Sequence, residues 1–242
     1  MRGLGTIVNA AAIIAGGLCG LLFRRFLKAR CQETVMHAVG FAIIVMALGG
    51  ALSQMLVFRL TAEGQGTLET RGTMMMIVSL AAGALAGEAA DLENWFARLG
   101  AWLRNKSGNE NDSRFLDAFL SATLTVCIGA MAIIGSLQDG ISGSHETLYA
   151  KAILDFLIVM TMTASLGKGC IFSAIPVAVL QGTITALAGL IEPLMTPAAL
   201  SNISLVGSVL ILCVGVDLIW PKTIRVANVL PAIVIAGAFA LV

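Results

Sequence analysis

The sequence predicts an all-α protein: a polytopic bundle of transmembrane helices, with about eight spans and duplicated helical hairpins. The 242 residues are 58% hydrophobic and only 12% charged, about half the charge of a soluble domain. The mean hydropathy is +0.93, so the chain has too little polar surface to cover itself in water. Apolar stretches of membrane-spanning length recur along the chain, and most basic residues fall in every second connection between them, which is one side of the membrane.

Eight apolar stretches meet or nearly meet the roughly 20 residues that a helix needs to cross the hydrocarbon layer. They are residues 4–22, 34–57, 73–90, 115–137, 148–167, 170–191, 200–219 and 224–241. The third is short and the joint at 167–169 can be drawn differently, so seven spans is an alternative. No alternating ten-residue pattern recurs, which argues against a membrane β-barrel. We expect one integral membrane domain over residues 1–242.

Charge sets the orientation of these spans. With the N-terminus outside, eleven of the fifteen Lys and Arg residues lie on the inner side: Arg24, Arg25, Lys28, Arg30, Arg98, Arg104, Lys106, Arg114, Lys168, Lys222 and Arg225. The other four (Arg2, Arg59, Arg71 and Lys151) lie outside. This excess follows the positive-inside rule and places both termini outside. A cleaved signal carries its charge before the apolar run, so the first stretch is expected to remain as a span.

The opening glycine pattern recurs 67 residues later. Gly5, Thr6, Ala15, Gly16, Leu18 and Gly20 are matched without a gap by Gly72, Thr73, Ala82, Gly83, Leu85 and Gly87. The segments 46–52 and 131–137 also match, so two repeated hairpins are predicted, 3–58 and 70–138, followed by a second half, 147–242. Small residues gather where membrane helices approach closely. The pairs Gly16/Gly20 and Gly83/Gly87 are therefore predicted packing sites.

Polar residues within the spans are candidates for a solute or ion path. Asp155 is the leading one, and Lys151 lies one helical turn before it, so a structural ion pair is the alternative. Asn9, Gln181 and Asn228 lie in other spans, where hydrogen bonding between helices is the alternative role. Pro176 and Pro231 are candidate helix breaks that could expose carbonyl groups to a cavity. Asp117 and Asp217 lie near predicted inner ends, and pairing with nearby basic residues explains them more simply.

Several classes of function find no support in the sequence. A net charge of +1 gives no basic face for nucleic acid. The five cysteines share no ligand spacing, and His37 and His145 are isolated, so neither a metal site nor a cofactor is predicted. No ATP-binding or catalytic motif occurs, and an enzyme is not expected. The loop 91–114 begins as an amphipathic segment that suits a helix on the cytoplasmic membrane surface, with a partner-binding helix as the alternative.

Motifs along nearly the whole chain resemble the YqgA/YdfK-like family of bacterial inner-membrane proteins. They include GTIVNAAAIIAGGLCG, AGALAGE, GAMAIIGSLQDGISG, LYAKAILDF, SLGKG, FSAIPVAVLQGTIT, SLVGSVLIL and RVANVLPAIVIAG. The resemblance implies a multi-pass protein of the bacterial inner membrane, in a family defined as a domain of unknown function. It places Asp139, Lys151, Asp155, Gln181, Asn228 and Pro231 within recognisable motifs and gives none of them a role.

These observations predict a transporter or channel for a small solute or ion, driven passively or by a gradient. The alternative is a non-transporting scaffold or regulatory component that acts through helix–helix assembly. The predicted partners are the lipid bilayer, an unidentified solute or ion, and a second copy of the chain in a homodimer or higher oligomer. The oligomer is expected from the small-residue faces alone.

Overall fold

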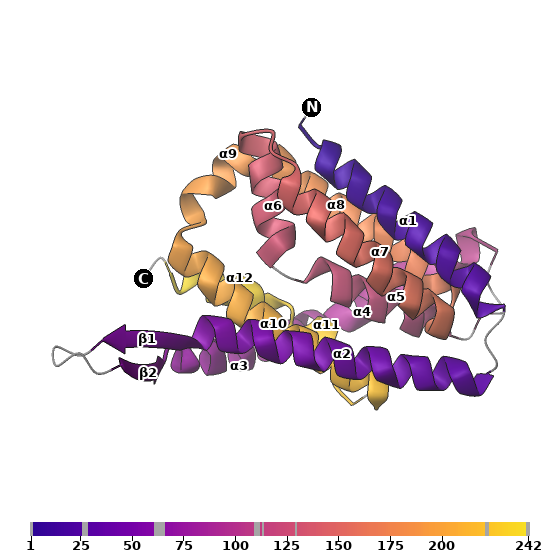
Figure 1. Cartoon of the computed structure of the whole chain (residues 1–242), viewed down its shortest axis with the longest axis horizontal. Coiled ribbons are helices and arrows are strands. Elements are labelled where there is room, and N and C mark those ends of the chain that lie inside the picture. The colour runs from indigo at the N-terminus through magenta and orange to yellow at the C-terminus, as the bar shows by residue number, and fades with distance from the viewer. Residues whose placement is uncertain are drawn as a thin grey trace.

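The chain folds almost entirely into helices (Figure 1), and the all-α prediction is confirmed. The computed structural model describes residues 2–25, 29–60, 66–108, 112, 114–128, 130–220 and 223–240. Lys28 and Lys222, two of the basic residues assigned to the inner side, lie outside these ranges.

Six helices are long and apolar enough to cross a membrane within the described ranges. Five are α1 (Leu4–Arg24), α2 (Ala29–Met55), α3 (Thr73–Ala90), α7 (Glu146–Leu166) and α10 (Pro197–Ile219). The sixth joins the 3-10 helix η1 (Lys168–Ser173) to α8 (Ala174–Ala186). The short elements α9 (Ala188–Ile191) and η2 (Glu192–Leu194) follow α8.

The fourth predicted span, 115–137, is not one straight helix, and its crossing of the membrane stays a prediction. It forms α5 (Phe115–Cys127) and α6 (Ala130–Ile141), which bend by 60° and would count as a seventh span if they cross together. The break follows from Ile128, whose extended backbone (φ −83°, ψ 122°) ends α5. Hydrophobicity could not predict it, since the whole stretch is apolar.

The last predicted span, 224–241, holds a shorter apolar helical segment in two pieces, α11 (Val226–Val229) and α12 (Pro231–Ala238). Pro231 is the first residue of α12, a position where its fixed φ and missing N–H cost nothing. Because this segment is shorter than 18 residues, eight spans remain a prediction.

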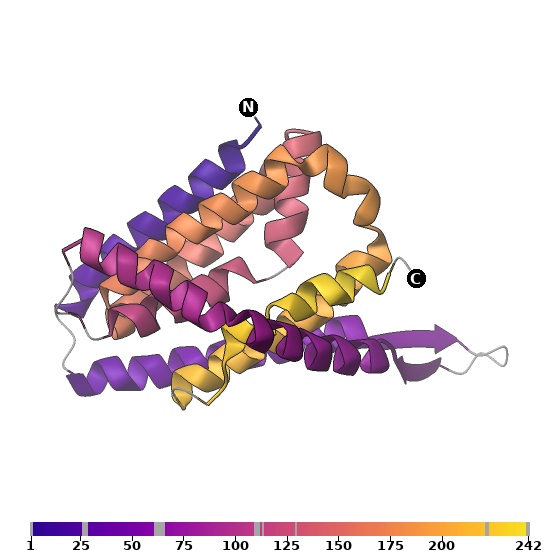
Figure 2. The ribbon, with the colours of Figure 1, turned by 180° about the vertical axis from the view of Figure 1, so that it is seen from behind.

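The helices form two layers (Figures 1 and 2). In one layer α1 packs along α7 and α8, beside α5 and α6; in the other α2 packs along α10, and α3 packs on α11 and α12. A single buried apolar cluster, which includes Ile13, Val159, Val206 and Ala232, draws on both layers. Large apolar side chains also cover the outside: Leu85 is 76% exposed and Val234 is 74% exposed, as expected where a helix faces lipid.

The predicted glycine pairs lie at close contacts between helices. A Cβ on Gly16 or Gly20 would overlap the backbone carbonyl of Phe156 or Met160 on α7. A Cβ on Gly83 or Gly87 would overlap the backbone of Ala232 or Asn228. All four glycines therefore pack within one chain, and the face that suggested assembly with a second copy is already occupied.

Two smaller elements lie between the long helices. A β-hairpin of β1 (Leu56–Leu60) and β2 (Gly66–Thr70) joins α2 to α3, a feature that the all-α prediction did not include. The alternation in LVFRL is its local signal, too short to stand out beside the apolar run before it. The amphipathic segment of the loop 91–114 forms α4 (Leu92–Lys106), whose Gly100 meets Leu116 and Phe119 of α5.

Candidate functional site

Four polar side chains that the sequence singled out meet inside the first layer. We call Asn9, Lys151, Asp155 and Gln181 the buried polar network. The amide nitrogen of Asn9 (Nδ2) donates hydrogen bonds to Asp155 Oδ2 at 3.0 Å and to Gln181 Oε1 at 3.3 Å. Lys151 Nζ lies 2.9 Å from Asp155 Oδ1 and 2.8 Å from Asp155 Oδ2. Three helices far apart in sequence, α1, α7 and α8, thus share one hydrogen-bonded group.

The break in the α5–α6 pair gives Lys151 a further partner. Lys151 Nζ donates a hydrogen bond of 2.8 Å to the carbonyl oxygen of Val126, in the last turn of α5. The last four carbonyls of a helix have no partner within it, and this end carries the negative pole of the helix dipole. The ammonium group therefore stabilises a helix end that would otherwise be buried without a partner.

Asp155 lies near the middle of α7, and the network around it is shielded from solvent. Asp155 is the tenth of the 21 residues of α7, so it is about 15 Å from either end of that helix. Asp155 is 2% exposed, Lys151 7%, and Asn9 and Gln181 are fully buried. A charged group at this depth is stabilised only by its partners, because burial without them costs several kcal/mol.

Two atoms of the network have no hydrogen-bond partner among the described residues: Asn9 Oδ1, an acceptor, and Gln181 Nε2, a donor. More than nine in ten buried polar groups in native structures are satisfied. The amide groups beside Asp155 are thus left with one free acceptor and one free donor.

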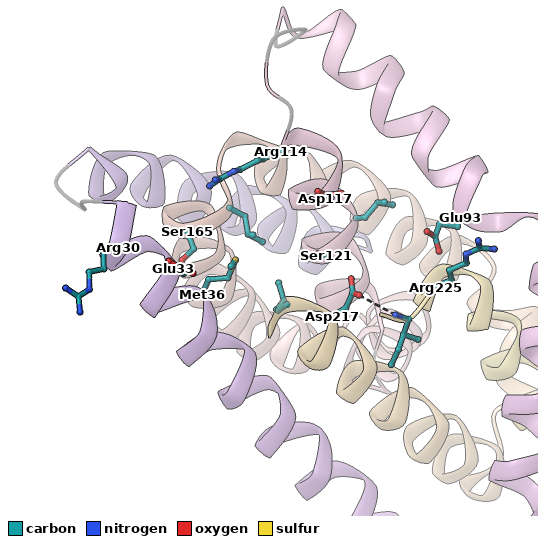
Figure 3. Close-up of a pocket in the computed structure, with 14 residues that line it drawn as sticks. Arg30, Glu33, Met36, Glu93, Arg114, Asp117, Ser121, Ser165, Asp217 and Arg225 are labelled. Carbon is teal, nitrogen blue, oxygen red and sulfur yellow. Dashed lines mark hydrogen bonds between the residues drawn. The ribbon is translucent and has the colours of Figure 1, made fainter. Parts of the chain in front are cut away.

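A cavity of about 1000 Å³ opens near the end of the molecule where α1 passes to α2 (Figure 3). We call it the charged cavity. Its lining comes from α2, α4, α5, α7, α10 and the start of α11: Arg30, Glu33, Met36, Glu93, Arg114, Asp117, Leu120, Ser121, Ser165, Leu166, Asp217, Leu218, Ile224 and Arg225. Figure 3 shows Asp117, Ser121 and Asp217 near its centre and Glu93 beside Arg225. Both signs of charge are present, so the cavity suits water and small polar solutes.

The charged cavity approaches the buried polar network along α5 without reaching it. A second cavity of about 50 Å³ shares Leu120 and Ser121 with it and extends to Leu124, which is two residues before Val126. Leu124 itself, together with Val159 and Met162 of α7, is buried and belongs to the apolar core. This apolar segment separates the two polar regions in the present structure.

Asn228 belongs to a different group, at the edge of the charged cavity. It accepts a hydrogen bond from the backbone N–H of Glu93 at 2.7 Å and donates to Glu88, which also pairs with Arg225. Burial is the main cause that raises the pKa of Glu93 above its ordinary value of 4.5; the nearby Asp217 adds to this rise and Arg225 opposes it.

Asp139 closes the other end of the first layer. This fully buried carboxylate accepts hydrogen bonds from the backbone N–H groups of Gly3 (3.0 Å) and Gly5 (3.2 Å), which is the favourable place for an anion at a helix N-terminus. His145 Nδ1 lies 3.0 Å from Asp139 Oδ1. These contacts fix the start of α1 against the α6–α7 connection.

The structure groups the predicted residues unevenly. Asn9, Lys151, Asp155 and Gln181 come together, while Asn228 lies in the second layer with Glu88. Pro176 is the third residue of α8, after the 3-10 turn, and Pro231 begins α12, so each lies near the start of an α-helix rather than in its middle.

Sequence reasoning missed the charged cavity, whose members Glu93, Asp117 and Asp217 come from three different helices. Asp217 accepts hydrogen bonds from the N–H groups of Thr223 and Ile224; Lys222, the basic partner expected for it, lies outside the described residues. The only signal in the sequence for this cavity was that these three carboxylates lie near the predicted ends of spans. Across the described part of the chain, no three His, Cys, Asp or Glu side chains are placed to hold a metal ion.

Comparisons with known proteins match the chain almost end to end. The family model described as "Protein of unknown function (DUF554)" matches residues 4–241. The chain is 29% identical over 231 residues to the uncharacterized membrane protein YdfK of Bacillus subtilis (strain 168), which covers 96% of this chain and 93% of that protein. It is 28% identical over 237 residues to the uncharacterized protein YqgA of Escherichia coli (strain K12), with 96% and 94% covered. No solved structure matches. The resemblance seen in the motifs is confirmed.

Proposed function

Since the chain belongs to the DUF554 family, whose members are described only as proteins of unknown function, we propose that it is a transporter or channel for a small solute or ion. The observation that carries the proposal is the buried Lys151–Asp155 pair, in which Asp155 lies near the middle of α7 and Lys151 binds the open end of a broken helix. Discontinuous helices with charged groups near mid-membrane are a recurrent way to build a transport site.

The charged cavity supplies the access route in this proposal. It opens at the end where α1 passes to α2, and a second, small cavity beside it is lined along α5 as far as Leu124. The opposite end is held by Asp139 on the N-terminus of α1. The proposed conformation is therefore open at one side and closed at the other, with movement of α5, α6 or α7 needed to bring solute to the network.

We place this protein in the bacterial inner membrane, with both termini outside and the charged cavity facing the cytoplasm. The positive-inside excess supports this orientation, and the membrane description of the Bacillus relative supports the membrane location. Transport is passive or gradient-driven in this proposal, and the polar groups serve binding and passage rather than catalysis. Scaffolding through glycine faces has less support, because Gly16, Gly20, Gly83 and Gly87 already pack inside one chain.

Flux measurements on purified protein in liposomes test the proposal. The probes are radiolabelled rubidium, phosphate, glycine and ethanolamine, each applied with and without a pH gradient. We expect at least one probe to enter faster than into protein-free vesicles, and Asp155→Asn to slow that entry about tenfold or more, since the mid-span charge is lost.

Glu192→Gln is the matched control, because this carboxylate is exposed in the short η2 turn and its loss should leave flux unchanged. The transport proposal fails if folded wild-type protein moves no probe faster than empty vesicles. It also fails if Asp155→Asn and Glu192→Gln behave alike.

A further inference from the structure

We propose that the oxygen atoms that hold the Lys151 ammonium form a binding site for a solute with a primary ammonium group, and that Lys151 itself fills this site in the present structure. The substrate class follows only if the proposed transport function holds. The geometry around Lys151 supports the site itself independently of transport.

The acceptors around Lys151 Nζ match an ammonium head. They are the Val126 carbonyl at 2.8 Å and the two carboxylate oxygens of Asp155 at 2.9 Å and 2.8 Å. A primary ammonium has three N–H donors and no acceptor, and its bonds to a carboxylate are charge-assisted. The helix end at Val126 adds a carbonyl at the negative pole of α5. Nothing in this set depends on the ammonium being attached to Lys151.

Unpartnered atoms near the ammonium offer one acceptor and one donor to the polar part of a ligand. Asn9 Oδ1 and Gln181 Nε2 have no partner among the described residues, and both side chains are fully buried. Asn9 Nδ2 already lies 3.0 Å from Asp155 Oδ2 and 3.3 Å from Gln181 Oε1. The free acceptor is on Asn9, whose amide contacts the Asp155 carboxylate, and the free donor is on Gln181, whose amide contacts Asn9. A ligand with its own donor and acceptor would satisfy both.

Exchange between Lys151 and a ligand keeps a positive charge next to the Asp155 carboxylate. One ammonium replaces another next to Asp155, so the buried carboxylate is never left without a counter-ion, which is the costly state. The four-carbon stem of lysine is flexible, so its head can withdraw while the backbone of α7 stays in place. In this scheme Lys151 is a tethered competitor for the solute.

Chemical rescue in purified Lys151→Ala protein tests the site without any transport measurement. The substitution removes the ammonium and leaves Asp155 unpaired, so we expect Tm in detergent to fall by about 10 °C. Ammonium or methylammonium chloride should then restore most of this loss as its concentration rises. Sodium and potassium chloride at equal ionic strength should restore little, since they screen charge without donating hydrogen bonds.

The double variant Lys151→Ala/Asp155→Asn is the matched control, because it has no buried charge to neutralise. Its Tm should not depend on methylammonium. The site is refuted if methylammonium raises the Tm of both variants equally, or if all four salts act alike. If Lys151→Ala folds only when methylammonium is present, the site is supported; if it fails to fold even then while the double variant folds, the site is refuted.

The two proposals fail separately. Rescue of Lys151→Ala together with no flux of any probe would keep the ammonium site and overturn transport. Flux that depends on Asp155 together with no rescue would keep transport and overturn the ammonium site.

Discussion

Gly16 shows how a single hydrogen atom in place of a side chain sets the packing of the first layer. A Cβ at this position would overlap the Phe156 carbonyl oxygen on α7. Because the neighbour is backbone, it cannot move aside by changing a rotamer. The close contact also brings Asn9 of α1 to Asp155 of α7, two residues of the buried polar network.

We therefore expect Gly16→Ala to destabilise the protein by about 1–3 kcal/mol, the usual cost of overpacking. Gly49→Ala is the control, since Gly49 lies inside α2 and a Cβ added there would meet nothing within 4 Å. This second change should be neutral or stabilise by up to about 1 kcal/mol, because Ala favours the helix. Denaturant or thermal unfolding in detergent measures both, and equal stabilities would contradict the packing role of Gly16.

The residues of the buried polar network could be predicted one by one, but the backbone carbonyl of Val126, which binds Lys151, could not. Asp155, Asn9 and Gln181 are conspicuous because polar groups are costly in apolar spans. The Val126 carbonyl becomes a ligand only because α5 ends beside it, a backbone event that apolar composition does not encode. The meeting of Glu93, Asp117 and Asp217 in one cavity was missed for a related reason: only the tertiary fold brings the ends of three helices together.

Among the elements, α4 has one face packed against α5 and one face that is exposed. Gly100 and Leu103 are buried on α5, whereas Trp95 is 57% exposed and Trp102 is 54% exposed. The Lys106 ammonium lies 4.9 Å from the centre of the Trp102 ring. Exposed tryptophans with a nearby basic residue are typical of a helix at the membrane surface, the role that the amphipathic pattern predicts.

Tryptophan fluorescence tests this position for α4. In the variant Trp95→Phe/Trp220→Phe only Trp102 remains of the three tryptophans. In liposomes we expect lipids brominated near the headgroup to quench it more strongly than lipids brominated near the chain ends, because an interfacial helix lies only about 5–10 Å deep. Strong quenching by aqueous iodide with none by brominated lipid would instead favour a helix that projects into water and binds a partner.

For the whole molecule, two polar regions lie in one helical bundle at different depths. The charged cavity is formed by both layers, while the buried polar network lies inside the first layer. Composition predicts the bundle well, since lipid-facing surfaces need only apolar residues. It could not predict the bend between α5 and α6, which depends on local backbone geometry within apolar sequence. The division between α11 and α12 falls just before Pro231, a residue that the sequence marks as a candidate helix break.

The orientation of the bundle decides which compartment the charged cavity meets, and cysteine labelling measures it. On a background without the five native cysteines, Ser142→Cys lies in the exposed α6–α7 connection and Ser107→Cys in the exposed turn after α4. Because basic residues favour the cytoplasmic side, we expect a membrane-impermeant maleimide to label position 142 in intact spheroplasts and position 107 only after lysis. The reverse pattern would place the cavity outside and invert the side from which solute first enters.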